Sequence, residues 1–379
     1  MTVIGINASR LRSGGARAHL IGILKDTDPL AHGISKVHVW SFEDLLNTLP
    51  TAPWLIKHNP PELDRSLIHQ VWWEYHSLPK EARRKNCGVL FNADAGTVCG
   101  FRPSVVMSQD MLSFEEKEMQ RFRYSLGWIR LLVLKYVQSR SMRRADGVIF
   151  LTNYAANSIQ EATGPIDDFT VIPHGVGEAF RQTTADGVWS KQDGAEIRCL
   201  YVSNALPYKH QWNVIRAVGL LRKREHNISL LLAGGGVGQA QRLLEEEMDR
   251  VDPHGEFVKQ IGFVEHDCLP ELIANADIFV FASSCENMPN ILLEAMASGL
   301  PIASSNRGPM PEILDDGGVY FDPENPNSIS MAIEQIVTDE KMRISIAARA
   351  KELSEKYSWQ RCASETWDCL NQTIRNYNR

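Results

Sequence analysis

The chain has 379 residues, enough for two domains that each bury a hydrophobic core. It is 44% hydrophobic and 23% charged, as globular proteins are, and no apolar run reaches the roughly 18 residues that span a bilayer. The net charge of −6 argues against a general nucleic-acid binder, and seven scattered cysteines without a CxxC pair favour a cytoplasmic protein with reduced thiols.

The first half of the chain alternates short apolar runs with helical patterns. Its start lacks the basic beginning and long apolar middle of a signal peptide, and residues 2–7 read as a strand that leads through a glycine-containing loop into a helix. Further strands are expected at 54–59, 87–92, 104–110 and 147–152. This alternation predicts a parallel sheet covered by helices on both faces.

Residues 121–144 form a basic stretch with seven Lys and Arg and no acidic residue. Such an amphipathic stretch can lie on an anionic lipid surface, which would make the protein peripheral on the cytoplasmic face of a membrane. A helix that packs its apolar residues on its own sheet, with the basic residues in water, gives the same pattern. The sequence leaves both interpretations open.

The same alternation returns in the second half. Strands are expected at 197–203, 228–234, 257–264, 276–283, 301–305 and 318–321. Because residues 181–196 are polar and lack an apolar period, we place the domains at 1–178 and 179–356, and we expect residues 357–379 to form a helix that crosses back to the first domain. The predicted fold class is α/β, with two doubly wound, Rossmann-like domains facing a cleft.

The stretch SSCENMPNILLEAMASGLP, residues 283–301, places Glu286 before a predicted helix and Glu294 more than one turn inside it. Pro289 stands at the helix start, where its missing N–H costs little. Unpaired N–H groups are expected there on Met288, Asn290, Ile291 and Leu292. Together with the positive end of the helix dipole they would form a phosphate seat, and the two carboxylates could accept hydrogen bonds from sugar hydroxyls. Taken alone, the spacing is also compatible with two solvated glutamates.

The pattern E-x7-E, entered from ADIFVFAS and followed by AMASGLPIASS and MPEIL, resembles that of the retaining glycosyltransferases of family 4, which have the GT-B fold. SGGARAHL resembles the family's first glycine-rich loop, VIPHGV its interdomain segment, YVSNALPYKH its phosphate-binding loop and YSWQRCA the start of its terminal helix, so nearly the whole chain is covered. The resemblance implies a retaining, metal-independent hexosyltransferase without a cofactor. Its donor would be a GDP- or UDP-sugar and its acceptor a glycan or a polyprenyl-diphosphate-linked glycan of bacterial surface polysaccharide, such as O-antigen or capsule.

The resemblance also assigns roles to individual residues. Glu286 would contact hydroxyls of the donor sugar and Glu294 the nucleotide ribose, while Lys209 would neutralise the charge that builds on the departing diphosphate. The remaining donor-binding positions are Gly14, Gly15, Asn204, Asn287, Met288, Asn290 and Ile291.

Two positions depart from the family pattern. Asn204 stands where the family usually has an arginine, so Arg12 or Arg307 could supply the missing positive charge. Gln109 stands near the reacting sugar where many members have a histidine; glutamine does not titrate, so it is not a general base. Since no carboxylate nucleophile emerges, the resemblance implies front-face substitution in which the leaving diphosphate helps to deprotonate the acceptor.

Several other sequence patterns imitate known motifs. The DTD at 26–28 imitates a metal-binding motif but reads as a solvated turn, so no metal is inferred. The glycine run at 234–238 fails the dinucleotide fingerprint because Gln239 or Gln241 takes the place of the third glycine. Trp72 and Trp73 could stack on sugars, although core packing is the safer expectation. The alternative functions are a nucleotide-sugar hydrolase or epimerase, and a non-catalytic nucleotide-sugar-binding subunit.

Overall fold

The computed structural model describes residues 2–12, 14–25, 27–182 and 194–379, which form two compact units. The first unit comprises Met1–Gly175 and Tyr357–Arg379, and the second comprises Val176–Lys356. The chain thus enters the second unit within a few residues of the predicted boundary at 178. Most of the polar segment 181–196 lies outside the described residues, as do Ser13 of the first glycine-rich loop and Asp26 of the DTD turn.

The first unit is built on a seven-stranded parallel sheet in the order β3-β2-β1-β4-β5-β6-β7. Its strands are β1 (Thr2–Asn7), β2 (Ile34–Trp40), β3 (Leu55–His58), β4 (Val89–Asn92), β5 (Ser104–Met107), β6 (Gly147–Phe150) and β7 (Phe169–Val171). The buried strands β4, β5 and β6 coincide with predicted apolar runs. The sequence analysis missed β2, because Ser35, Lys36 and His38 interrupt its apolar pattern.

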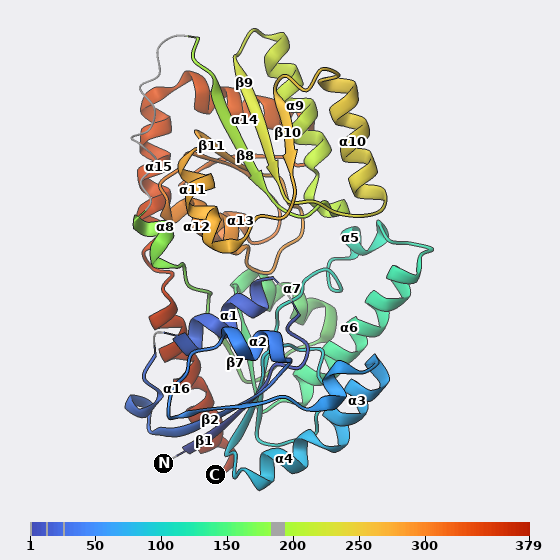
Figure 1. Cartoon of the computed structure of the whole chain (residues 1–379), viewed down its shortest axis with the longest axis vertical. Helices are drawn as coiled ribbons and strands as arrows, with labels where there is room; N and C mark the ends of the chain where they lie inside the picture. Colours follow the sequence, from blue (N-terminus) through green and yellow to red (C-terminus); the bar gives the residue numbers. More distant parts are fainter. Residues whose placement is uncertain (1, 13, 26, 183–193) are drawn as a thin grey trace. The chain divides into compact units, whose positions relative to one another are not determined.

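Eight α-helices are described in the first unit, and the last of them comes from the end of the chain. They are α1 (Gly15–Lys25), α2 (Glu43–Thr48), α3 (Leu67–His76), α4 (Leu78–Arg84), α5 (Glu116–Gln120), α6 (Leu126–Arg144), α7 (Asn153–Thr163) and α16 (Trp359–Tyr377). Figure 1 shows α16 beside the first helix of the chain, where Trp367 is fully buried and its indole N–H donates to Thr27 Oγ1 at 2.9 Å. Residues 93–103, which connect β4 to β5, form a loop in place of a crossover helix.

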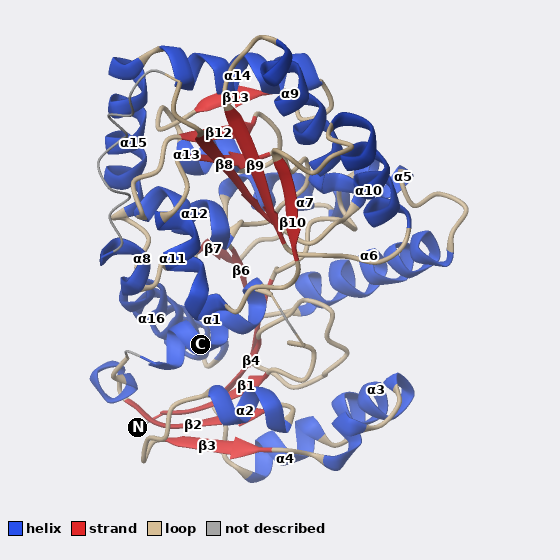
Figure 2. Ribbon diagram, turned by 45° about the horizontal axis from the view of Figure 1, so that its top comes forward, coloured by secondary structure: helices blue, strands red, loops and turns tan. Residues whose placement is uncertain are grey.

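The second unit is built on a six-stranded parallel sheet in the order β10-β9-β8-β11-β12-β13. Its strands are β8 (Ile197–Val202), β9 (Ile228–Ala233), β10 (Val258–Ile261), β11 (Ile278–Phe281), β12 (Ile302–Ser305) and β13 (Val319–Phe321), all within predicted runs. Its helices are α8 (Glu178–Gln182), α9 (Gln211–Lys223), α10 (Gln239–Val251), α11 (Leu269–Ala274), α12 (Asn290–Ala297), α13 (Met310–Leu314), α14 (Pro326–Thr338) and α15 (Glu340–Ser354). Figure 2 shows these helices around the strands, with α9 packed against α10 and α14, and α12 against α15.

Both sheets are doubly wound, as predicted. In the first sheet the strand order reverses between β1 and β4, and in the second between β8 and β11. The loops that leave two such strands diverge at the carboxyl edge of the sheet, and ligands of open α/β sheets bind at that point. In the second unit, a ligand site is therefore expected at residues 203–210 after β8 and 282–289 after β11.

Candidate active site

The two loops at the switch point of the second sheet are bonded to each other. The Ser284 N–H donates to the Tyr208 carbonyl at 2.8 Å, and the Ser284 hydroxyl lies 2.9 Å from His210 Nε2. His210 has a left-handed backbone with φ of 49°, which non-glycine residues rarely adopt, and this turn ends the loop where α9 begins. The sequence analysis gave neither Ser284 nor His210 a role. Their contacts fix the positions of the residues on either side of them.

Lys209 and Glu286 meet between these loops. The Lys209 ammonium donates to Glu286 Oε1, and the two side chains are only 13% and 15% exposed. The structure therefore brings together two residues that the resemblance placed separately on the phosphate and on the sugar. An ion pair in this partly buried place orients both side chains at the carboxyl edge of the sheet.

Tyr201 of β8 contacts the backbone of Lys209. Its hydroxyl donates to the Lys209 carbonyl at 2.6 Å, and the side chain is fully buried. Burial, together with the smaller effect of the Glu286 carboxylate, raises the pKa of Tyr201 well above its ordinary value, so the phenol stays protonated and remains a donor. Nothing in the sequence pattern separated this tyrosine from an ordinary core residue.

The glycine run that failed as a dinucleotide fingerprint has a packing role. Gly234 has a φ of +112°, and a Cβ on it would lie 2.5 Å from the Ser203 carbonyl oxygen. The Ala205 N–H donates to the Gly235 carbonyl at 3.2 Å. The run thus lets the loop that carries Asn204 pack closely against its neighbour, and Asn204 itself is exposed.

Helix α12 begins at Asn290, directly after Pro289. The expectation that the Leu292 N–H is unpaired is wrong, because this group donates to the Pro289 carbonyl at 3.1 Å and closes the first turn. Asn287 and Met288 are buried beside the helix start, whereas Ile291 is partly exposed. The candidate phosphate seat at the start of this helix is therefore smaller than the sequence suggested.

Glu294 lies inside α12 and is mostly buried. Its Oε1 is 2.9 Å from His266 Nε2, and this hydrogen bond raises the pKa of His266 against the opposing effect of burial. The hydrogen bond to the imidazole orients the Glu294 carboxylate. His266 precedes α11 in a turn whose sequence carries no motif, so this partner was not foreseen.

The two arginines considered as substitutes for the missing phosphate-loop arginine are both engaged within their own units. Arg307 pairs with Asp322 Oδ1 at 3.2 Å in the second unit. Arg12 lies 3.2 Å from the centre of the Phe42 ring and donates to the Leu63 carbonyl in the first unit. Lys209 therefore remains the principal cation of the candidate site in the second unit.

The first-unit candidates follow β1 and β5. Gly14 precedes α1 with a φ of +73°, which favours glycine, and Gly15 is the first residue of that helix. Gln109 lies two residues beyond β5, and its amide donates to Met107 Sδ at 2.9 Å. Each residue lies past the carboxyl end of a strand, where a ligand of the first sheet would bind.

The switch point of the first sheet also holds a buried polar network that the sequence analysis did not identify. Glu74 of α3 is 1% exposed and accepts hydrogen bonds from Asn7 (2.8 Å), Thr97 (2.6 Å) and Arg10 (2.7 Å). Asn7 also donates to Asn92 at 3.0 Å. These bonds cross-link β1, β4, α3 and the loop after β4.

Trp72 and Trp73 differ in burial. Trp73 is buried in the core beside Trp40 and Leu78, as expected, but Trp72 is 56% exposed, so the core assignment was wrong for it. Within the described ranges, no group of three or more His, Cys, Asp or Glu side chains is arranged to hold a metal ion.

Solved structures with the same fold cover nearly the whole chain. The sucrose-phosphate synthase of Thermosynechococcus elongatus matches with a TM-score of 0.77 and 16% identity over 99% of this chain and all of its own. The HepE protein of Anabaena, solved in complex with UDP and glucose, matches with a TM-score of 0.74 and 19% identity over 98% of this chain and 99% of its own. The fold is the GT-B fold, as the sequence predicted.

Residues 189–353, which belong to the second unit, match the model of the family described as Glycosyl transferases group 1. The chain is 30% identical over 167 residues to O-antigen chain mannosyltransferase B of Escherichia coli, a match that spans 44% of either chain. It is 25% identical over 262 residues to a GDP-mannose-dependent alpha-(1-6)-phosphatidylinositol monomannoside mannosyltransferase of Mycobacterium tuberculosis, over 65% of this chain and 67% of that one. The chain thus spans less than half the length of the first of these relatives.

Proposed function

We propose that the protein is a retaining, metal-independent glycosyltransferase that moves a hexose from a GDP- or UDP-sugar to a glycan or lipid-linked acceptor. The observation that carries the proposal is the Lys209–Glu286 ion pair between the two loops at the switch point of the second sheet. The group 1 glycosyltransferase match covers the same unit. The proposed setting is surface-polysaccharide synthesis on the cytoplasmic side of a bacterial membrane, which the O-antigen mannosyltransferase relative supports.

The ion pair suggests how the donor is bound. An arriving diphosphate attracts the Lys209 ammonium, and the Glu286 carboxylate is then free to accept hydrogen bonds from the sugar hydroxyls. Glu294, held by His266, accepts from the ribose. Each partner thus exchanges one charged contact for another, so the site loses little electrostatic energy when the donor enters.

The same groups fit front-face transfer. The bond between the anomeric carbon and the diphosphate oxygen breaks while the acceptor oxygen bonds to that carbon on the same face, and the acceptor proton passes to the leaving diphosphate. Lys209 stabilises the charge that develops on this leaving group, an electrostatic effect that is often the largest in catalysis. The roles expected for Gln109 and for the Gly14–Gly15 turn of the first unit stay predictions.

The donor can be found by thermal shift with UDP-, GDP- and ADP-sugars, because a ligand that binds only the folded chain raises its unfolding temperature. A mannosyl donor is the first to test, since both quoted curated relatives are mannosyltransferases. Incubation of the stabilising donor with and without acceptor then separates transfer from hydrolysis or epimerisation, which proceed without acceptor.

Glu286→Gln tests the proposed role of the carboxylate. It should abolish most of the transfer while keeping the unfolding temperature, whereas Glu246→Gln, on the exposed face of α10, should be neutral in both. Transfer at the wild-type rate by Glu286→Gln would remove this residue from the mechanism. Donor stabilisation without turnover on any acceptor would favour the non-catalytic binding subunit.

A further inference from the structure

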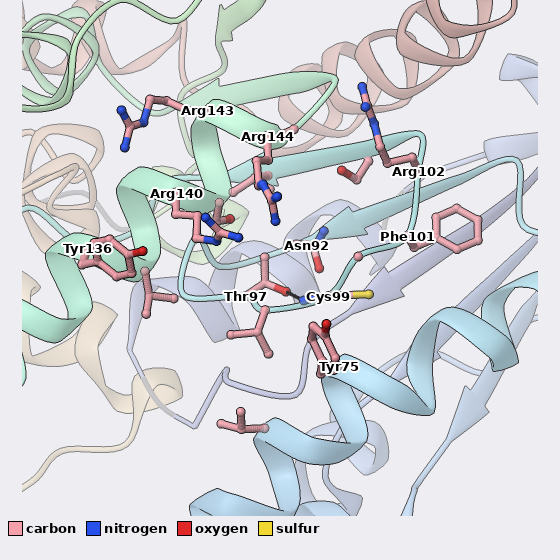
Figure 3. A pocket seen from close by; sticks show the side chains of 18 residues that line it. Tyr75, Asn92, Thr97, Cys99, Phe101, Arg102, Tyr136, Arg140, Arg143 and Arg144 are labelled. Atoms are coloured by element: carbon pink, nitrogen blue, oxygen red, sulfur yellow. Dashed lines mark hydrogen bonds between the residues drawn. The ribbon is translucent and has the colours of Figure 1, made fainter.

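A cavity of about 840 Å³ is lined by residues of the first unit alone, whereas the Lys209–Glu286 pair belongs to the second unit. Its walls come from the β4–β5 loop, from α3, from the C-terminal half of α6 and from Ser104 and Val106 of β5 (Figure 3). Ser104 and Val106 are two positions apart in one strand and so face the same side of the sheet. The cavity is therefore a trough on a face of the first sheet, where a crossover helix would otherwise lie.

The trough is strongly basic. Four arginines line it, Arg102, Arg140, Arg143 and Arg144, and none of its 18 lining residues is acidic. Arg102 is paired with Asp146, but Arg140 and Arg144 have no carboxylate partner among the described residues. Figure 3 shows Arg140 and Arg144 extending toward the middle of the trough while Arg143 points away. Two unpaired guanidinium groups converging on one space are suited to a phosphate group.

Exposed apolar side chains on two helices border the trough. On α6, Ile129, Val133 and Tyr136 follow one another at helical spacing and are 54 to 64% exposed. On α3, Ile68 and Tyr75 lie on one face and are 79% and 60% exposed. Tyr136 and Tyr75 also line the trough, so the apolar faces are continuous with the basic site.

The exposure of α6 favours the lipid-surface interpretation of residues 121–144. A helix that buried all its apolar residues on its own sheet would hide the Ile129–Tyr136 face, but that face is exposed, and Leu131 and Met142 are the buried large apolar residues of α6. Contiguous exposed apolar surface of this kind marks an interaction site. No helix of the described residues is long and apolar enough to cross a bilayer.

We propose that the arginine-lined trough and the apolar faces of α3 and α6 bind an anionic phospholipid at a bilayer surface. The phosphate head group lies between Arg140 and Arg144, and the apolar side chains of both helices contact the acyl region. The positive charge of the trough matches the anionic head group of the lipid, and the apolar rim matches its acyl chains. The site is separate from the donor site proposed for the second unit, so either proposal can fail without the other.

Vesicle flotation tests this site. The wild-type chain should float with vesicles of phosphatidylcholine containing phosphatidylglycerol and not with phosphatidylcholine alone. Arg140→Gln/Arg144→Gln should weaken binding to the anionic vesicles by about tenfold or more, because each arginine near an anionic surface contributes about 1 kcal/mol. The control is Arg84→Gln/Arg375→Gln, which removes the same charge from exposed positions outside the trough and should bind as wild type.

A second pair of variants tests the apolar rim. Ile129→Ser/Val133→Ser should lose most of the binding to anionic vesicles, whereas Met331→Ser/Ile344→Ser, at exposed apolar positions of the second unit, should not. Equal binding by the trough variants and wild type, or a loss in the control variants of the same size, would overturn the proposal. So would stabilisation by soluble glycerol phosphate without vesicle binding, since that result indicates a site for a free phosphate compound.

Discussion

The strand order reverses in the same way in both sheets, but the charged side chains at the two switch points have different kinds of partner. In the first unit, Glu74 is 1% exposed and three side chains donate to it, so its hydrogen-bonding capacity is used inside the protein. In the second unit, Lys209 and Glu286 remain partly exposed and are paired with each other. A charge with several internal partners stabilises the fold, whereas a pair at the sheet edge can exchange its partners for a ligand.

The largest expected effect is on transfer. Lys209→Met removes the cation proposed to stabilise the leaving diphosphate and should lower kcat/KM by about a hundredfold or more. Stability should fall by less than the roughly 3 kcal/mol lost when a fully buried pair is broken, because water can reach part of the Glu286 carboxylate that is left behind. Steady-state kinetics and urea unfolding of the same preparation give both values. A large loss of stability would make the pair a structural feature like the network of the first unit.

Glu74→Ala should show the opposite behaviour. It leaves Asn7, Thr97 and Arg10 without their common acceptor and should lower the free energy of unfolding by about 3 kcal/mol. Urea unfolding measures this effect. Donor binding in the second unit, measured by calorimetry below the unfolding transition, should be unchanged. Wild-type stability in this variant would break the comparison.

A histidine pair makes the first unit sensitive to acid. Burial, then neighbouring His58, lowers the pKa of His38 to about 4, below the ordinary value of about 6.5. The folded chain disfavours protonated His38, so the free energy of unfolding is unaffected by this group above about pH 6.5 and falls as the pH drops toward 4. The loss should be up to about 2 kcal/mol by pH 5. His38→Gln should flatten the acid limb of the urea midpoint against pH, and an unchanged limb would contradict the assignment.

The smallest effect is expected at His266 and has the opposite sign. Its hydrogen bond to Glu294 raises the pKa of His266, so the stability it contributes is complete below about pH 6.5 and is lost as the pH rises through the raised pKa. Since the imidazole is 60% exposed, the contribution should stay below about 0.5 kcal/mol. His266→Asn should remove this weak alkaline decline in the urea midpoint. A larger decline in the variant would show that another group causes it.

Apolar runs allowed the sequence to predict most of the fold. The strands buried on both faces, such as β4 and β11, read clearly, whereas the polar residues Ser35, Lys36 and His38 concealed β2. The sequence also predicted Lys209 and Glu286 as site residues, but not that they pair. The two are 77 positions apart, and only the adjacency of β8 and β11 brings them together.

Partners that carry no motif could not be predicted. His266, Ser284 and Tyr201 act through hydrogen bonds whose geometry depends on the strand order. Likewise, residues 121–144 alone could not show which face of α6 is buried. The exposed face depends on residues 93–103, which connect β4 to β5 without a helix. Periodicity predicts elements well, but contacts between elements require the topology.

Calorimetric titration tests the central claim, that the Lys209–Glu286 pair exchanges its internal contact for the donor. The nucleoside diphosphate of the preferred donor and the intact sugar nucleotide are each titrated into wild type, Lys209→Met and Glu286→Gln. Lys209→Met should weaken binding of both ligands by about tenfold or more, whereas Glu286→Gln should weaken only the sugar nucleotide. Wild-type affinity of Lys209→Met for the diphosphate would contradict it.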